Sequence, residues 1–144
     1  MPVRIHLRAP IRPTEDAEKV AQAIVKLFPT AKPEIAATQV TAVATDLARL
    51  RELVRSTRIP DTARGQMRAG LANDGLSARF LLGKQAAAVG RAHFGPVRSP
   101  LGDIEVTLLG DAEHEVEQAI YHVAPDTTVA PELSEVPESL RPQP

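Results

Sequence analysis

The chain begins with residues that alternate between apolar and polar, a pattern typical of a β-strand with one buried face. Val3, Ile5 and Leu7 occupy the apolar positions, and Arg4 and Arg8 lie among the polar ones. From residue 20 to residue 28 the apolar residues recur at helical spacing instead, and the proline at position 29 ends that pattern. The N-terminal segment therefore predicts a strand followed by an amphipathic helix.

The rest of the chain continues as a mixture of strands and helices. Residues 32–45 are rich in valine and threonine, and they predict one strand or two short ones. Two helices follow, the first capped by Asp46 and the second opened by Pro60 in its first turn. After a turn, the pattern predicts three more strands and a final helix, over residues 76–82, 89–94, 104–108 and 111–123.

The order of these elements indicates the fold class. It is β-α-β-α-α-β-β-β-α, which lacks the regular alternation of strand and helix that builds a parallel sheet. We therefore predict an α+β domain over residues 1–124, with an antiparallel sheet and helices packed on one face. Residues 125–144 contain five prolines and neither period, so we expect a Pro-rich, acidic and mobile tail.

The amino-acid composition is that of an ordinary globular protein. Of the 144 residues, 43% are hydrophobic and 24% are charged, and cysteine is absent. The absence of cysteine excludes a disulfide framework and any cysteine-ligated zinc or iron–sulfur site. No apolar run approaches the roughly 18 residues of a membrane span, and the N-terminus lacks the apolar core of a signal peptide. We expect a soluble, cytoplasmic protein without membrane contact.

Charge is unevenly distributed along the chain, although the formal net charge is only −1. Residues 49–98 hold ten basic and three acidic side chains, whereas residues 99–144 hold one basic and ten acidic ones. Such asymmetry indicates an anionic partner for the basic block. The acidic tail could compete with that partner, or its apolar residues could dock on the domain, and the sequence leaves both alternatives open.

Motifs for catalysis and metal binding are missing or wrongly spaced. The glycines before Lys84 are too far apart for a phosphate-binding loop, and Gln85 stands where a serine or threonine would bind magnesium. His114 and His122 lie eight residues apart on the predicted last helix. That spacing is about 12 Å along the helix axis, too far for a shared metal ion. We therefore expect no enzyme activity, no catalytic residue, no metal and no cofactor.

Five arginines between residues 51 and 68 form the most informative cluster. Arg51, Arg55 and Arg58 are spaced i, i+4, i+7, so they share one face if the helix runs that far. Arg64 and Arg68 are spaced i, i+4 on the next predicted helix. The planar guanidinium group binds two phosphate oxygens at once. Either an external anion compensates the repulsion between these like charges, or nearby carboxylates and backbone carbonyls do.

Aromatic side chains suited to base stacking are expected to be nearly absent from the surface. Aromatic residues make up only 3% of the chain, and Phe28, Phe80 and Phe94 occupy predicted core positions. This argues against a reader of single strands that stacks bases on aromatic rings. It favours contacts with the backbone and shape of RNA.

Four blocks of sequence resemble those of a known archaeal family. The blocks IRPTEDAEKV, LRELVRSTRIPDTAR, LLGKQAAAVGRAHF and SPLGDIEVTL occur within residues 3–124. They are similar to the uncharacterised protein family zero-two-zero-one, whose members are described as predicted RNA-binding or exosome-associated proteins. The resemblance implies a fold like that of ribosomal protein L-five. It also adds Lys84 and Gln85, from the third block, to the candidate RNA-binding residues.

Together these patterns predict a non-enzymatic protein that binds structured RNA, for instance ribosomal RNA, in the ribosome or in RNA processing. Subunits of the exosome or the ribosome are further expected partners. The alternative is a protein–protein adaptor whose basic face binds an acidic partner subunit. The candidate RNA-binding residues are Arg51, Arg55, Arg58, Arg64, Arg68, Lys84 and Gln85.

Overall fold

The strand predicted at the N-terminus is the centre of a five-stranded sheet. The structure, a computed structural model, describes residues 3–95 and 103–125. Within them the strands lie in the order β2-β3-β1-β5-β4, and each is antiparallel to its neighbours. The strands are β1 (Arg4–Pro10), β2 (Glu34–Ile35), β3 (Gln39–Ala44), β4 (Ser77–Gly83) and β5 (Asp103–Leu109).

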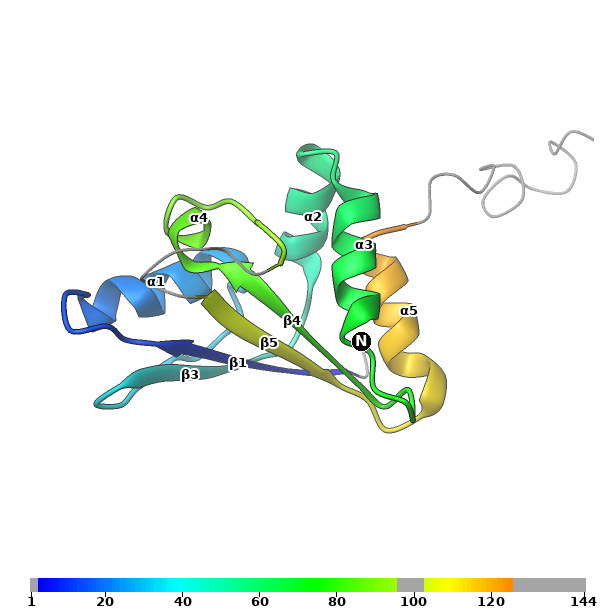
Figure 1. Cartoon of the computed structure of the whole chain (residues 1–144), viewed down its shortest axis with the longest axis horizontal. Helices are drawn as coiled ribbons and strands as arrows, with labels where there is room; N and C mark the ends of the chain where they lie inside the picture. The colour runs from blue at the N-terminus through cyan, green and yellow to red at the C-terminus, as the bar shows by residue number, and fades with distance from the viewer. Residues whose placement is uncertain (1–2, 96–102, 126–144) are drawn as a thin grey trace, which may run out of the picture.

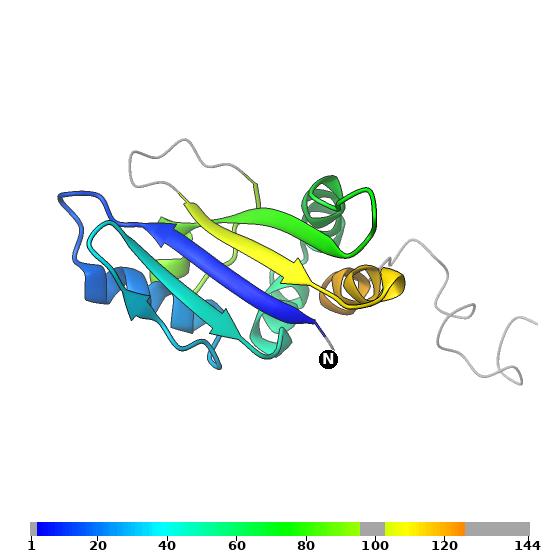
Figure 2. The ribbon, with the colours of Figure 1, turned by 90° about the horizontal axis from the view of Figure 1, so that it is seen from below.

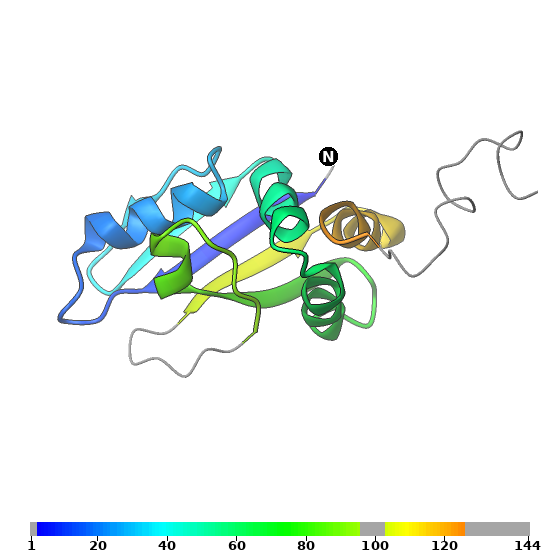
Figure 3. The ribbon, with the colours of Figure 1, turned by 90° about the horizontal axis from the view of Figure 1, so that it is seen from above.

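The helices of the described residues cover one face of this sheet (Figures 1 and 3). Helices α1 and α4 lie together over one end, and α2, α3 and α5 pack on one another over the other end. None of the described helices covers the opposite face of the sheet, which we call the uncovered face (Figure 2). No helix in the described ranges is long and apolar enough to cross a membrane. The helices are α1 (Ala17–Leu27), α2 (Ala48–Ser56), α3 (Pro60–Ala69), α4 (Lys84–Ala88) and α5 (Glu113–Val123).

The core lies between the sheet and the helices and is almost entirely aliphatic. Leu7 of β1 is paired with Ala42 of β3 and Val106 of β5, and all three side chains are buried. Ile24 of α1 and Ile120 of α5 close the core from the helical layer and are fully buried. Burying a side chain of this size contributes about 1.5–3 kcal/mol. The period-2 pattern of the strands therefore decides which face the helices cover.

The α+β class and the predicted order of elements are confirmed. Residues 32–45 form two short strands, and α3 begins at Pro60 as its fixed φ favours. Residues 89–94 are an exception, because they contribute only an isolated bridge between Phe94 and Leu82. Helix α4 lies between β4 and this segment. Gly90, at a φ of 77°, turns the chain after α4, so that only Phe94 pairs with β4. Beyond Pro125, the predicted tail lies outside the described residues.

The outer edge of β4 is closed by the two loop segments that flank it. The Arg79 amide donates to the carbonyl of Gly70 at 3.0 Å, and the Gly95 amide donates to the carbonyl of Leu81 at 3.0 Å. Gly70 lies so close to the strand that a Cβ atom there would be 1.7 Å from the Arg79 carbonyl oxygen. The contact between the end of α3 and β4 therefore requires glycine at this position.

We expect Gly70→Ala to lower the free energy of unfolding by about 3 kcal/mol, because α3 and β4 must separate to admit the methyl group. Gly65→Ala is the matched control, since Gly65 lies inside α3 with no atom within 4 Å of a Cβ. The control should raise stability by about 1 kcal/mol through its higher helix propensity. Urea denaturation measures both changes, and equal stability of the two variants would contradict this account of Gly70.

Candidate functional site

The connection between α2 and α3 is a tight corner with an arginine at its turning point. The Ile59 amide donates to the carbonyl of Val54 at 3.2 Å, and the Arg58 amide donates to the carbonyl of Arg55 at 3.2 Å. This is the hydrogen-bond pattern of a Schellman motif, whose turning residue adopts the left-handed conformation. Arg58 occupies that position with a φ of 58°. Three residues, 57–59, separate the end of α2 from Pro60, which begins α3.

A cavity of about 760 Å³ lies at this corner and is bordered by three of the predicted arginines, Arg51, Arg55 and Arg58. We call it the arginine cavity. Its remaining lining is partly apolar and comes from the α2–α3 corner, the start of α3 and the end of α5: Val54, Ile59, Pro60, Asp61, Thr62, Val123 and Pro125.

Two of the three arginines direct their charge to solvent. Within residues 3–95 and 103–125, the side chains of Arg55 and Arg58 have no hydrogen-bond or ion-pair partner, and both residues are exposed. Arg51 uses its Nε to donate to the carbonyl of His122 at 3.0 Å, which fixes the side chain beside α5. Burial, followed by the charge of Arg51, lowers the pKa of the His122 imidazole and so disfavours its charged form.

The first turn of α3 adds to the positive potential of the arginine cavity. Its N-cap residue, Ile59, has no side-chain oxygen for the free amides of the first turn. Helix N-termini carry a partial positive charge that favours anions. Asp61 is an acidic residue in the lining, and its carboxylate accepts from Nη2 of Arg64 at 2.6 Å. The negative charge in the cavity is thus already compensated.

Arg64 forms hydrogen bonds with the end of α5 and is not among the residues that line the cavity. Its side chain is only 14% exposed, and Nη1 donates to the carbonyl of Ala124 at 3.3 Å and to that of Pro125 at 2.9 Å. Carbonyls at the end of a helix have no partner within the helix, so a cation there is favourable. Arg64 therefore positions the residues that complete the wall of the arginine cavity.

Arg68 likewise forms its contacts with other residues of the chain. It donates to Glu117 at 2.8 Å and to the Tyr121 hydroxyl at 3.2 Å, and its guanidinium carbon lies 5.7 Å from the centroid of the Tyr121 ring. The hydrogen bond to Glu117 raises the pKa of Arg68 further above its ordinary value. Arg68 thus joins α3 to α5, and its charge is compensated locally.

Lys84, which the resemblance adds to the candidate RNA-binding residues, is buried and bonded within the fold. Lys84 is 4% exposed, and its Nζ donates to the carbonyl of Pro10 at 2.5 Å and to Glu15 Oε1 at 2.9 Å. The same Glu15 oxygen accepts from the Arg12 amide at 2.8 Å. Lys84 therefore ties the loop after β1 to the start of α4. Gln85 is exposed beside it, over the end of the sheet that α1 and α4 cover.

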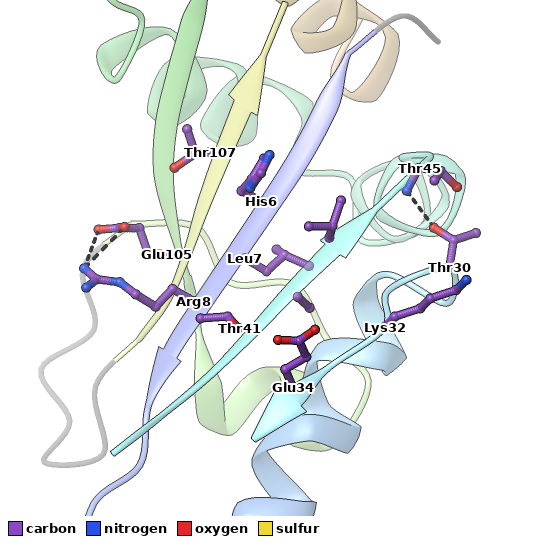
Figure 4. A pocket seen from close by; sticks show the side chains of 12 residues that line it. His6, Leu7, Arg8, Thr30, Lys32, Glu34, Thr41, Thr45, Glu105 and Thr107 are labelled. Atoms are coloured by element: carbon purple, nitrogen blue, oxygen red, sulfur yellow. Dashed lines mark hydrogen bonds and ion pairs between the residues drawn. The ribbon is translucent and has the colours of Figure 1, made fainter. Parts of the chain in front are cut away.

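The uncovered face of the sheet holds a second hollow, of about 660 Å³ (Figure 4). His6 and Thr107 lie side by side in its lining, because the sheet register pairs them. Arg8 and Glu105 form an ion pair of 3.4 Å across the same two strands. Its lining holds two basic residues, Arg8 and Lys32, and two acidic ones, Glu34 and Glu105, so this surface suits a polyanion less than the arginine cavity does.

Sequence patterns located the arginines but missed most of the cavity wall. Val123 and Pro125 enter the lining only because α5 packs against α2 and α3, which is a long-range contact. The hollow of Figure 4 also depends on strand register, and the only signal for it in the sequence is the polar face of β1. The sequence signal for the corner is Pro60, which follows a helical pattern. Helix α2 ends at Ser56, so Arg58 lies in the corner and not on the helical face shared by Arg51 and Arg55.

Comparison with known proteins places the chain in a family. It is 36% identical over 137 residues to a UPF0201 protein of Aeropyrum pernix, and the alignment covers 87% of each chain. The chain belongs to the UPF0201 family. This is the family zero-two-zero-one that the sequence blocks resemble, so that expectation is confirmed. No family model matches the chain.

Other UPF0201 relatives agree in sequence and in fold. The crystal structure of a UPF0201 protein from Methanococcus jannaschii superposes with a TM-score of 0.77 at 32% identity, covering 86% of this chain and 94% of that one. A UPF0200/UPF0201 protein of Archaeoglobus fulgidus is 41% identical over 106 residues. That alignment covers 73% of this chain but only 32% of the longer relative. The names of these UPF0201 proteins state no activity.

For this UPF0201 chain we expect Lys84→Ala to lower the free energy of unfolding by about 3 kcal/mol. The substitution leaves the buried Glu15 carboxylate and the Pro10 carbonyl without the ammonium group they share. Gln85→Ala is the matched control, because Gln85 is the exposed neighbour, and it should change stability by less than about 0.5 kcal/mol. Thermal unfolding of both variants measures the difference. If Lys84→Ala melts like the parent, the ion pair has no architectural role.

Proposed function

We propose that this protein binds structured RNA without changing it chemically, and that the arginine cavity is its main phosphate contact. The single observation that supports this most is the pair of exposed arginines, Arg55 and Arg58, that lack partners among the described residues at one cavity. Arginine is the side chain best suited to phosphate, since its planar fork binds two oxygens at once. The positive end of α3 adds to the same field.

The backbone of Arg58 gives an independent argument that its side chain has a role outside the fold. A residue at this position of a Schellman motif is usually glycine, because a Cβ atom in the left-handed conformation costs roughly 1–2 kcal/mol. Arg58 accepts that strain with a φ of 58°, and its side chain makes no hydrogen bond or ion pair with another described residue. Strain of this kind in a native structure supports a functional role for the residue.

The proposed phosphate contact includes fewer residues than the sequence analysis predicted. It comprises Arg51, Arg55 and Arg58, whereas Arg64, Arg68 and Lys84 stabilise the fold through the contacts described above. Gln85 lies at the other end of the molecule and would touch only an RNA that spans both ends. The setting in the ribosome or the exosome and the likeness to ribosomal protein L-five rest on the family resemblance and are part of this proposal.

An acidic protein partner is the second candidate, and the floor of the arginine cavity favours it. Val54 and Val123 are buried and Ile59 is half-buried, and we call these apolar lining residues the floor of the cavity. The three exposed arginines form its rim. A peptide that combines carboxylates with aliphatic side chains matches both parts of that surface. Phosphate groups need only the rim. An adaptor of this kind would show little RNA binding at any ionic strength.

The salt dependence of RNA binding tests the proposal. A hairpin RNA that neutralises three arginines should bind with a log–log salt slope of about −2 to −3. Arg55→Ala should weaken binding by about 1 kcal/mol at low salt, to a similar degree for different RNA sequences. Arg79→Ala is the control, because it removes the same charge from the uncovered sheet face, where the side chain is 69% exposed. If the slope is near zero, or if both variants lose equal affinity, the cavity is not the phosphate contact.

Arg58→Gly separates function from stability at a single position. Glycine relieves the left-handed strain but gains entropy in the unfolded chain, so stability should be unchanged or raised by up to about 1 kcal/mol. RNA affinity should fall about fivefold, since the charge is lost from the rim of the cavity. Denaturation and RNA titration on the same sample measure the two effects. A stable variant that still binds RNA like the parent would remove Arg58 from the proposed contact.

A further inference from the structure

We propose that the acidic segment that follows α5, residues 126–144, occupies the arginine cavity of its own chain and competes there with other anions. The effect on RNA rests on the function proposed above, but occupation of the cavity does not. The inference draws on three features of the described residues: where the chain leaves α5, the chemistry of the cavity lining, and the two arginines without a described partner.

The chain leaves α5 at the wall of the arginine cavity. Pro125, the last described residue, lines the cavity together with Val123. Nη1 of Arg64 donates to the carbonyls of Ala124 and Pro125, which fixes this exit beside the start of α3. The next residue in the sequence is Asp126. The segment therefore starts within reach of the arginines, whatever course it takes.

The segment and the cavity are complementary in charge and in apolar character. Residues 126–144 hold four acidic side chains and one arginine, while Arg51, Arg55 and Arg58 border the cavity. The pairs Glu132-Leu133 and Glu135-Val136 place a carboxylate next to an aliphatic side chain. The cavity offers the same two features, an arginine rim and an apolar floor. This match favours an acidic and aliphatic segment over a purely acidic one.

Because the segment is covalently attached beside the arginine cavity, even a weak contact between the two would be populated. Glu132 lies seven residues beyond Pro125, a span of roughly 23 Å when fully extended, so the segment can fold back onto the cavity. A short tether holds such a group at an effective concentration on the order of millimolar. A contact with a millimolar dissociation constant would then occupy much of the cavity. Binding of an external anion would be weakened roughly two- to tenfold.

A nitroxide label on the segment tests occupation of the cavity directly. The protein has no cysteine, so Ser134→Cys provides a single attachment site on the full chain. We expect the label to broaden the amide signals of residues 55–62 at low salt and to broaden them less as salt screens the charges. The control carries the same label together with Asp126→Asn, Glu132→Gln, Glu135→Gln and Glu138→Gln, and it should show little broadening there.

A mixture of labelled and isotope-enriched chains distinguishes the segment of the same chain from that of a second copy. Broadening in the mixture as strong as in the singly labelled chain would assign the cavity to a neighbouring molecule and overturn the proposal. Equal broadening by the acidic segment and by its neutral control would overturn it as well, because apolar docking alone would then hold the segment.

RNA titration of the unlabelled full chains gives the second readout. The charge-neutral variant should bind a hairpin RNA roughly two- to tenfold more tightly than the parent at low salt, with the gain shrinking as salt rises. Broadening without RNA binding by either chain would uphold the occupied cavity and overturn the RNA function. RNA binding of equal strength without broadening would uphold the RNA function and overturn the role of the segment.

Discussion

Strand β1 is hydrogen-bonded along both of its edges and is apolar on only one side, and the arrangement of the whole molecule depends on this constraint. The buried side of β1 faces the layer of helices, so the polar side, with Arg4, His6 and Arg8, remains on the uncovered face. The helices are then divided into two groups over the two ends of the sheet. The arginine cavity forms where α2, α3 and α5 meet, which is also where helix termini and their charges are concentrated.

The basic residues of the chain separate into two physical roles once their contacts are known. Arg64, Arg68 and Lys84 join elements far apart in sequence, and removing any of them would leave carbonyls or carboxylates without a donor. Arg55 and Arg58 have no such partners among the described residues and border a cavity beside a helix N-terminus. The arginine cluster looks uniform in sequence, but some of its members stabilise the fold and others border the cavity.

Local patterns predicted the fold well because the apolar residues of this chain alternate or recur without conflict. The α+β class and the start of α3 at Pro60 follow directly from them. The strand expected over residues 89–94 was wrong because a turn and one bridge satisfy that apolar segment, which no local pattern reveals. Lys84 was misplaced for a similar reason, since its partner Glu15 is 69 residues away in sequence. Burial of a charge is decided by tertiary contacts that spacing does not encode.

The position of bound RNA on the surface tests the central claim most directly. Full-length protein enriched in nitrogen-15 would be titrated at low salt with a short RNA hairpin while its backbone amide signals are followed. The account predicts that the largest shifts fall on residues 51–62 and 123–125, which form the arginine cavity. Largest shifts around His6, Thr41 and Thr107 on the uncovered sheet face, or no shifts at all, would contradict it.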